Sequence, residues 1–505
     1  MKKYWQNHIQ NISVATWAGL AMVVLGLLLR FRLYALHLSF WLDEAMLALN
    51  ITGRTFSGLI QPLDYAQGAP LGFLWVSKLA GLVLGNNEYG LRFIPFLLGC
   101  ASLFLLWKLA RELVHPAAVI FALLVFASSR YIVSYAVQVK QYSTDVAVTL
   151  GLYFLGWYIL KKEPTRKDNL LLGLAGALSI WMSHAAVFTV GALGTVLIVW
   201  AASKKDWGRT VRYAVVSAFW AVNFGFLYLL QYRNLAANSF LTNFWSDYFL
   251  PISISMPAWI LDRLAGLFYN PGGLSIVVPS WLILVLFFCG LASIFRRQTH
   301  WAWMLVLSLV FTLSASLVHK YPFGGRMGMF LLPGLLICAG EGVDLLRQFL
   351  HSRPKLGMTL SLLLMAGLVY SPLTFAIETF VKPKVSENIA PTLSFLKESY
   401  RPGDVIYLYH TSIPAFRYYA NQYGLAQAGV IIGEDHHLAP QAYQAELAPL
   451  AGNKRVWLLF SHLTDYEYLQ DRDAILEYAN QMGEKKRQFI DPGTAVNLYL
   501  YDLSP

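Results

Sequence analysis

Long stretches without a charged residue recur through the first 380 residues, and they restrict the possible folds more than any other feature. The runs at 169–203 and 264–295 contain no Asp, Glu, Lys or Arg. A helix needs about 20 mostly apolar residues to cross a membrane. The chain is 57% hydrophobic and only 13% charged, and a water-soluble core of ordinary size does not bury that much apolar surface. The sequence therefore predicts an α-helical protein that crosses the membrane many times.

Basic residues between the apolar runs predict the orientation of the helices, because Lys and Arg are enriched in cytoplasmic loops. The predicted topology depends on whether the short segment 69–85, which holds Lys78, crosses the membrane. If it crosses, the later basic loops face outside. If it lies along the outer interface as a juxtamembrane helix, they all face the cytoplasm, and we adopt this reading. Lys2 and Lys3 then place the N-terminus inside. Eleven crossings are expected, near 12–34, 91–110, 116–136, 145–160, 169–183, 185–202, 212–231, 275–295, 300–318, 327–346 and 356–377.

Residues 384–505 differ in character, because acidic residues outnumber basic ones there and short apolar strands alternate with helical patterns. The sequence predicts a membrane domain at 1–380 and a small extracytoplasmic α/β domain at 384–505. The net charge of +11 belongs to the membrane loops, so no nucleic-acid partner is expected. In the second domain, strands are expected at 404–409, 455–460 and 495–503, and helices at 386–399, 412–423 and 464–482.

The stretch "SFWLDEAMLALN" (39–50) places Asp43 and Glu44 side by side where the first crossing emerges. One reading is structural: both are first-turn acids of an interfacial helix, stabilised by its dipole by about 0.3–1 kcal/mol. The other is chemical: a carboxylate at headgroup height acts as general base or metal ligand for a lipid-borne substrate. Taken alone, the two residues leave both readings open.

Two further outer loops carry polar residues. In "VQVKQYSTD" (137–145), Lys140 and Asp145 are either interfacial charges or functional groups. In "VHKYPFGGR" (318–326), Lys320 and Arg326 place positive charge on the outer face, against the bias of the other loops. Arg offers two-pronged contacts to a phosphate and Lys a point charge, so this loop is predicted to hold a phosphate. The remaining candidates in the two loops are Gln138, Tyr142, His319 and Tyr321.

Together these features resemble the GT-C membrane glycosyltransferases, nearest to the bacterial protein-mannosyltransferase-like set of glycosyltransferase family 39. The features are the Asp-Glu pair, the "APLG" start of the interfacial helix, "Q-x-K-Q-Y-S-x-D" and "YP-x-G-G-R". The resemblance covers roughly residues 1–380. It implies an inverting hexosyl- or pentosyltransferase of a bacterial inner membrane. This enzyme would move a sugar from a polyprenyl-phosphate donor to a lipid, glycan or protein acceptor on the extracytoplasmic face.

By position, the resemblance implies that Asp43 takes the acceptor proton and that Glu44 assists it. Lys140, Lys320 and Arg326 would then bind the donor phosphate, with the other loop residues in support. Related sequences often carry an acid where this chain has Gln138, and an amide binds divalent metal less well than a carboxylate. The sequence therefore does not require a metal cofactor, and the candidate ligands for one are Asp43, Glu44 and Asp145.

Two other classes of function stay open. An O-antigen ligase or polymerase-like enzyme also uses polyprenyl carriers but depends on outer loops rich in Arg and His, whereas region 232–274 holds only Arg233 and Arg263 and no His. A lipid or solute transporter needs charged or broken helices near the membrane midplane. The expected mid-helix positions here are almost all apolar, so transport ranks third.

Overall fold

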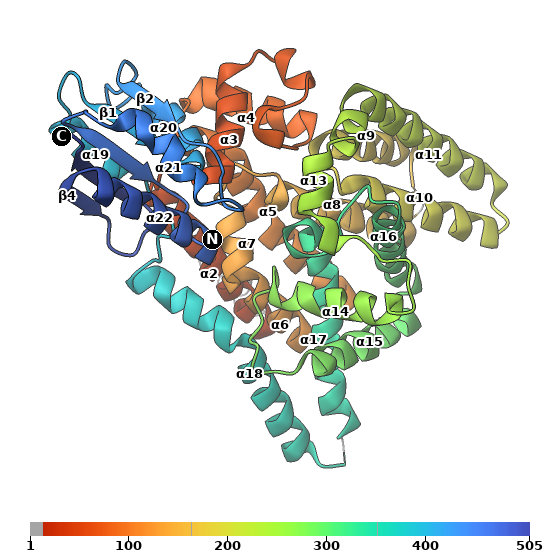
Figure 1. Ribbon diagram of the computed structural model, residues 1–505. Helices are drawn as coiled ribbons and strands as arrows, with labels where there is room; N and C mark the ends of the chain where they lie inside the picture. Colours follow the sequence, from red (N-terminus) through yellow and green to blue (C-terminus); the bar gives the residue numbers. More distant parts are fainter. Residues whose placement is uncertain (1–13, 163, 351, 505) are drawn as a thin grey trace, which may run out of the picture. The chain divides into compact units, whose positions relative to one another are not determined.

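A computed structural model describes residues 14–162, 164–350 and 352–504, and the chain forms two compact units that interleave along the sequence (Figure 1). The helical unit contains the chain up to Ala35, Thr55–Gly85 and Tyr89–Lys382. The C-terminal unit contains Leu36–Arg54, Asn86–Glu88 and the chain from Pro383 onward. The domain limits expected from the sequence, 1–380 and 384–505, stay a prediction.

The described part of the helical unit is built almost entirely from helices around one continuous apolar core. Its main helices are α2 (Val14–Ala35), α4 (Leu71–Leu84), α5 (Glu88–Leu113), α6 (Pro116–Ser128), α7 (Arg130–Tyr135), α8 (Tyr142–Lys161), α9 (Arg166–Met182), α10 (Ala186–Ser203), α11 (Trp207–Leu227), α12 (Arg233–Ala236), α13 (Ser239–Phe244), α14 (Met256–Tyr269), α15 (Ser280–Arg297), α16 (Thr299–Leu317), α17 (Leu332–Phe349) and α18 (Pro354–Val381). A π-helical turn, Tyr228–Tyr232, joins α11 to α12, and a 3₁₀ segment, Gly325–Leu331, leads into α17.

Nine helices among the described residues are long and apolar enough to cross a membrane. They are Val14–Ala35, Glu88–Leu113, Tyr142–Lys161, Ala186–Ser203, Trp207–Ala236, Ser280–Arg297, Thr299–Leu317, Gly325–Phe349 and Lys355–Val381. Two other expected crossings coincide with the shorter helices α6 and α9. A polytopic helical membrane protein is therefore confirmed, while the count of eleven and the orientation stay predictions. Lys2 and Lys3 lie outside the described residues.

The crossing expected at 116–136 is interrupted, because helix α6 ends at Ser128 and α7 starts at Arg130. The carbonyls of Phe126 and Ala127, left over at the end of α6, accept hydrogen bonds from the fully buried guanidinium of Arg30 at 3.3 and 3.4 Å. A cation at a helix C-terminus also interacts favourably with the helix dipole. Arg30 on α2 thus stabilises the interruption, and the chain can turn into the loop that carries Lys140.

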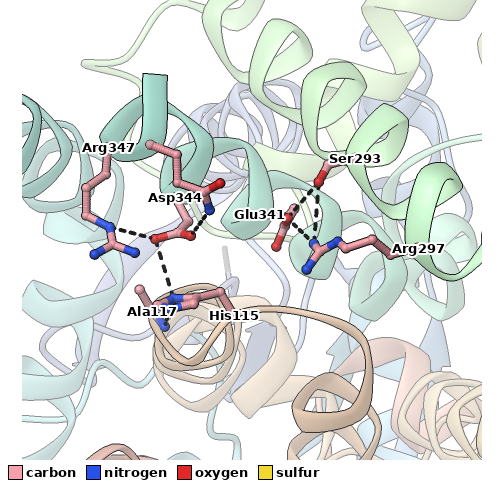
Figure 2. Close-up of polar contacts among 8 residues, drawn as sticks. His115, Ala117, Ser293, Arg297, Glu341, Asp344 and Arg347 are labelled. Carbon is pink, nitrogen blue, oxygen red and sulfur yellow. Dashed lines mark hydrogen bonds and ion pairs between the residues drawn. The ribbon is translucent and has the colours of Figure 1, made fainter. Parts of the chain in front are cut away.

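Helices α15 and α17 lie side by side in the helical unit, at a distance that only glycine permits (Figure 1). A Cβ on Gly290 would lie 1.8 Å from the Cys338 carbonyl oxygen, and one on Gly342 would lie 2.0 Å from that of Leu286. Small residues permit such close approach of membrane helices. Figure 2 shows the polar contacts at this helix pair. The Glu341 carboxylate pairs with Arg297 and accepts from Ser293, and Asp344 accepts from Arg347 at 3.0 Å and faces His115.

The C-terminal unit holds a five-stranded sheet in the order β2-β1-β3-β5-β4. Strands β2, β1 and β3 run parallel, and β5 pairs antiparallel with β3 and β4. The strands are β1 (Val405–Leu408), β2 (Gly429–Ile432), β3 (Val456–Phe460), β4 (Glu484–Ile490) and β5 (Asn497–Asp502), and the helices are α3 (Leu42–Gly53), α19 (Ala390–Ser399), α20 (Ile413–Tyr419), α21 (Ala442–Leu447) and α22 (Tyr466–Met482). The three expected strands are confirmed, and β2 and β4 were missed.

Candidate active site

The acid pair lies in the first turn of α3, after Trp41 in an extended conformation. Asp43 is partly exposed, whereas Glu44 is 1% exposed. Successive helix residues point about 100° apart, so the two carboxylates face different surroundings. The first-turn position expected from the structural reading is present, and the chemical reading remains compatible with the partial exposure of Asp43.

Helix α3 is anchored within the C-terminal unit by the segment that precedes it. The Tyr419 hydroxyl on α20 accepts a hydrogen bond from the Phe40 amide at 2.8 Å and donates to the carboxylate of Glu88. The Ser39 hydroxyl donates to Asn388 Oδ1 at 2.8 Å. Trp41 stacks on His462 with ring centres 5.8 Å apart. The segment before the helix that carries Asp43 is therefore held by residues of the C-terminal unit, a link that has no signal in the sequence.

The second-loop motif contributes a buried cation to the helical unit. Lys140 is 4% exposed, and its ammonium donates to Gln67 Oε1 at 2.6 Å. Gln67 lies directly after Tyr65 and Ala66, two non-glycine residues in the left-handed region with φ of 60° and 49°. Such a conformation is costly and is found most often at ligand-binding sites. Burial gives this cation a stronger field than an exposed lysine would have.

Asp145 lies in the first turn of α8 and is 6% exposed. The Ser183 side chain interacts with its carboxyl group, while Oδ1 has no hydrogen-bond partner among the described residues. Tyr321, outside the spanning helices, lies close enough that burial and then Asp145 raise the pKa of its phenol well above the usual range. An incompletely satisfied buried carboxyl group has the capacity to accept a hydrogen bond from a ligand or a water molecule.

The late loop meets the second loop through Arg326. Its guanidinium carbon lies 5.8 Å from the centre of the Tyr142 ring and 5.3 Å from that of Trp245. Aromatic faces hold a guanidinium in position through ring contacts that do not use its N–H donors. Two motifs predicted separately from the sequence are thus adjacent, and Trp245 is a neighbour that the sequence analysis missed.

The Gly324–Gly325 turn packs against Tyr248. Gly324 has φ of +146°, and a Cβ there would lie 2.7 Å from Cδ1 of Tyr248. The turn borders an open hollow of about 570 Å³, including open solvent, which Arg263 also lines. The Arg263 guanidinium lies 4.7 Å from the centre of the Tyr248 ring. The glycine is therefore required for the close approach of the loop to this aromatic side chain.

The other predicted loop residues have more ordinary surroundings. Lys320 is exposed, and its ammonium lies 3.5 Å from the Ala236 carbonyl oxygen. His319, with φ of 54°, packs edge-on against Phe249. The Tyr321 hydroxyl donates to the Met327 carbonyl at 3.0 Å. Gln138 has a buried Oε1 with no hydrogen-bond partner among the described residues. Lys320 is the least constrained of the three predicted phosphate ligands.

His184 lies in the turn between α9 and α10. Its ring packs edge-on against Tyr232 with ring centres 4.8 Å apart. Burial lowers the pKa of His184 to about 4, so the ring is neutral at physiological pH. Within the described residues, no group of three or more His, Cys, Asp or Glu side chains is arranged to hold a metal ion.

Comparisons with known proteins agree with this architecture. Residues 68–228 match the family model described as dolichyl-phosphate-mannose-protein mannosyltransferase. The crystal structure of ArnT from Cupriavidus metallidurans in the apo state matches with a TM-score of 0.54 and 15% identity, over 97% of this chain and 98% of that chain. The same protein bound to undecaprenyl phosphate gives 0.54 and 14%, with the same coverage. No curated protein sequence matched the chain.

The Archaeoglobus fulgidus oligosaccharyltransferase, in complex with Zn and sulfate, matches with a TM-score of 0.51 and 12% identity, over 95% of this chain and 73% of that chain. At such low identities the likeness establishes the fold alone. The chain has the GT-C glycosyltransferase fold, which confirms the resemblance drawn from its loops. More particularly, it is similar to ArnT over nearly its whole length, including the region after residue 380.

Proposed function

We propose that this protein is an inverting glycosyltransferase that moves a sugar from a polyprenyl-phosphate donor to an acceptor hydroxyl on the extracytoplasmic face of a bacterial inner membrane. The observation that carries the proposal is the full-length likeness to ArnT, a GT-C protein with a structure bound to undecaprenyl phosphate. The buried Lys140 and the aromatic-flanked Arg326 support it, because both are suited to an anionic phosphate.

The chemistry assigns a role to each candidate residue. The Asp43 carboxylate takes the proton of the acceptor hydroxyl as its oxygen attacks the anomeric carbon. The bond between that carbon and the phosphate oxygen breaks, and the polyprenyl phosphate leaves with the electron pair. Lys140, Lys320 and Arg326 stabilise the added negative charge on the leaving phosphate. A single displacement of this kind inverts the anomeric carbon.

The supporting residues act by position rather than by chemistry. Glu44, which is buried, assists Asp43 from within the fold, and Tyr142 holds the Arg326 guanidinium. Asp145, Gln138, His319 and Tyr321 shape the surroundings of the two loops. The acceptor is a lipid, a glycan or a protein, and the donor sugar is a hexose or a pentose. Asp43, Glu44 and Asp145 stay the candidate oxygen ligands for a divalent ion, but no three acidic, His or Cys side chains among the described residues are grouped to hold one, and no step in this scheme requires it.

The test is transfer from a radiolabelled undecaprenyl-phosphate sugar by the purified protein in lipid nanodiscs, with envelope extract as acceptor. Asp43→Asn keeps the shape of the side chain but not its proton affinity, so transfer should fall by about 10²–10⁴-fold. Asp465→Asn is the matched control: this exposed aspartate also begins a helix of the C-terminal unit, and its loss should be silent. If Asp43→Asn transfers sugar at the wild-type rate, Asp43 is a structural first-turn acid of α3 and not the general base.

A further inference from the structure

An open hollow in the helical unit has a lining unlike that of the phosphate-binding candidates. Its empty volume is about 400 Å³, open solvent included, and it lies between the loop at 60–69 and the segment 231–238, which holds the end of the π-helical turn and α12. Five of its lining side chains are amides: Gln61, Gln67, Gln231, Asn234 and Asn238. Among the described residues that line it, none is Asp, Glu, Lys, Arg or His.

The backbone on both sides of this hollow is irregular. Gln231 belongs to the π-helical turn Tyr228–Tyr232, and single π turns inside helices occur frequently at functional sites. Across from it, Gln67 follows the left-handed residues Tyr65 and Ala66. Two costly conformations therefore present amides to one space, and such conformations persist where the surrounding structure, often a ligand site, requires them.

Gln231 is the amide with remaining hydrogen-bonding capacity. Its Nε2 donates to the Ala69 carbonyl at 3.0 Å, which fixes the side chain. Its buried Oε1 has no hydrogen-bond partner in the part of the chain that the structure describes. Buried polar atoms are nearly always paired in native proteins, so this oxygen has the capacity to accept a hydrogen bond from a ligand or a water molecule.

We propose that this amide-lined hollow binds an uncharged sugar ring. Each amide offers both donors and acceptors, the same combination that sugar hydroxyls require. Leu63 and Leu235 in the lining provide apolar contact for the C–H groups of the ring. An amino sugar would bring a second positive charge near the Lys140 ammonium, and no carboxylate lines the hollow to compensate it. The hollow therefore selects neutral sugars over amino sugars.

The inference rests on the proposed function and specifies which class of sugar the donor carries. Gln67 lines the hollow and accepts from Lys140 at 2.6 Å, so the sugar site adjoins the cation proposed for the donor phosphate. A sugar linked directly to that phosphate would occupy the hollow, which assigns it to the donor. The same chemistry would also suit a neutral sugar on a glycan acceptor, and the experiment separates the two sources.

The test compares the affinities of the full-length protein in nanodiscs for undecaprenyl phosphate, an undecaprenyl-phosphate hexose and an undecaprenyl-phosphate amino sugar. In Gln231→Met, of similar size, affinity for the hexose compound should fall by about 2- to 10-fold with bare undecaprenyl phosphate unaffected. Gln231→Glu should reverse the preference in favour of the amino sugar. Asn223→Leu is the matched control, because this α11 amide bonds Trp181 and Ala177 within the fold, and it should not alter the ratio of the affinities.

The outcomes are distinct. A raised KM for a neutral glycan acceptor, with all donor affinities unchanged, would support the hollow as a sugar site and assign it to the acceptor. If the Gln231 variants lower the affinity for all three lipids equally, or have no effect on any of them, the sugar-site proposal would be overturned. If the wild type binds none of the lipids, the donor proposal fails. In that case saturation-transfer NMR with methyl hexosides tests the sugar site separately. A wild-type signal that is lost in Gln231→Glu would support sugar binding in the hollow. The absence of a wild-type signal would overturn it.

Discussion

The guanidinium carbon of Arg326 lies 5.8 Å from the centre of the Tyr142 ring, so a loop after α16 meets the start of α8. Trp245 flanks the same guanidinium at 5.3 Å. This arrangement differs from that of a surface arginine, which reaches water or lipid headgroups freely. The two aromatic faces hold the planar group in one orientation, and a phosphate would meet its edge.

Replacing Arg326 separates a phosphate ligand from an interfacial anchor. Lysine keeps the charge but loses the planar, two-pronged geometry. Arg326→Lys should lower transfer at least tenfold, about 1.4 kcal/mol of transition-state stabilisation, and Arg326→Ala should lower it further. The measurement is the transfer rate, with donor affinity followed separately. Arg233, exposed on α12, provides the control Arg233→Lys, which should be silent. Full activity of Arg326→Lys would exclude the phosphate role.

The hydroxyl of Tyr419 supports the helix that carries Asp43. Tyr419→Phe would leave the Phe40 amide and the Glu88 carboxylate without this partner, both in buried positions. An unsatisfied buried polar group costs about 1–3 kcal/mol. We expect a lower thermal unfolding midpoint and slower transfer with donor affinity preserved. Tyr418→Phe is the neighbouring control, because its hydroxyl bonds the Asn86 carbonyl in an exposed position where water can substitute. Equal effects of the two changes would contradict the anchoring role.

The sequence was a good guide where the signal is local. Uncharged apolar runs marked the spanning helices, and alternating apolar strands marked β1, β3 and β5. Strand β4, "EKKRQFI", was missed because its side chains are almost all exposed and carry four charges, so it has no apolar period. The break after Ser128 was missed because its cause is distant: Arg30 lies 97 positions before Ala127.

The candidate site shows the same limit. Arg326 was recognised because its loop places positive charge against the bias of the other loops, and Lys140 was recognised from the resemblance of its motif. Their partners Gln67 and Trp245 were not, because an uncharged amide or an indole carries no such signal. The amide hollow depends on residues about 165 positions apart, Gln67 and Gln231, which come together only in the folded chain. A pairing of this kind has no periodicity that a single sequence reveals.

Gly324 is expected to be intolerant of any side chain, whereas its neighbour is not. An alanine at 324 would bring a Cβ to 2.7 Å from the Tyr248 ring at a φ of +146°. Backbone strain of this kind costs about 1–3 kcal/mol, and the displaced loop would move Arg326. Gly324→Ala should therefore lower both the unfolding midpoint and transfer. Gly325, with φ of +49° and its nearest neighbour at 3.8 Å, should accept asparagine with little change. If Gly324→Ala has the wild-type unfolding midpoint and transfer rate, the Tyr248 ring must move aside at little cost.

Helix α4 decides the topology, and its dimensions favour the interfacial reading. Fourteen residues at 1.5 Å per residue span about 21 Å, less than the roughly 30 Å of a hydrocarbon core. Lys78, near its middle, is 9% exposed and lies over the Phe56 ring at 5.8 Å. A helix of this length lies more readily along the membrane surface than across it. Residues on both sides of α4 should therefore face the same compartment.

Labelling with a membrane-impermeant thiol reagent tests this directly, after Cys100, Cys289 and Cys338 are replaced by alanine. Asn87→Cys, at an exposed position just after α4, should react in intact cells. Lys204→Cys, in the exposed loop before α11, should react only after the cells are permeabilised. The converse result, with Asn87→Cys protected and an exposed Lys108→Cys labelled from outside, would show that α4 crosses. The later loops would then be inverted, Lys140 and Arg326 would face the cytoplasm, and the extracytoplasmic reaction proposed for them would be excluded.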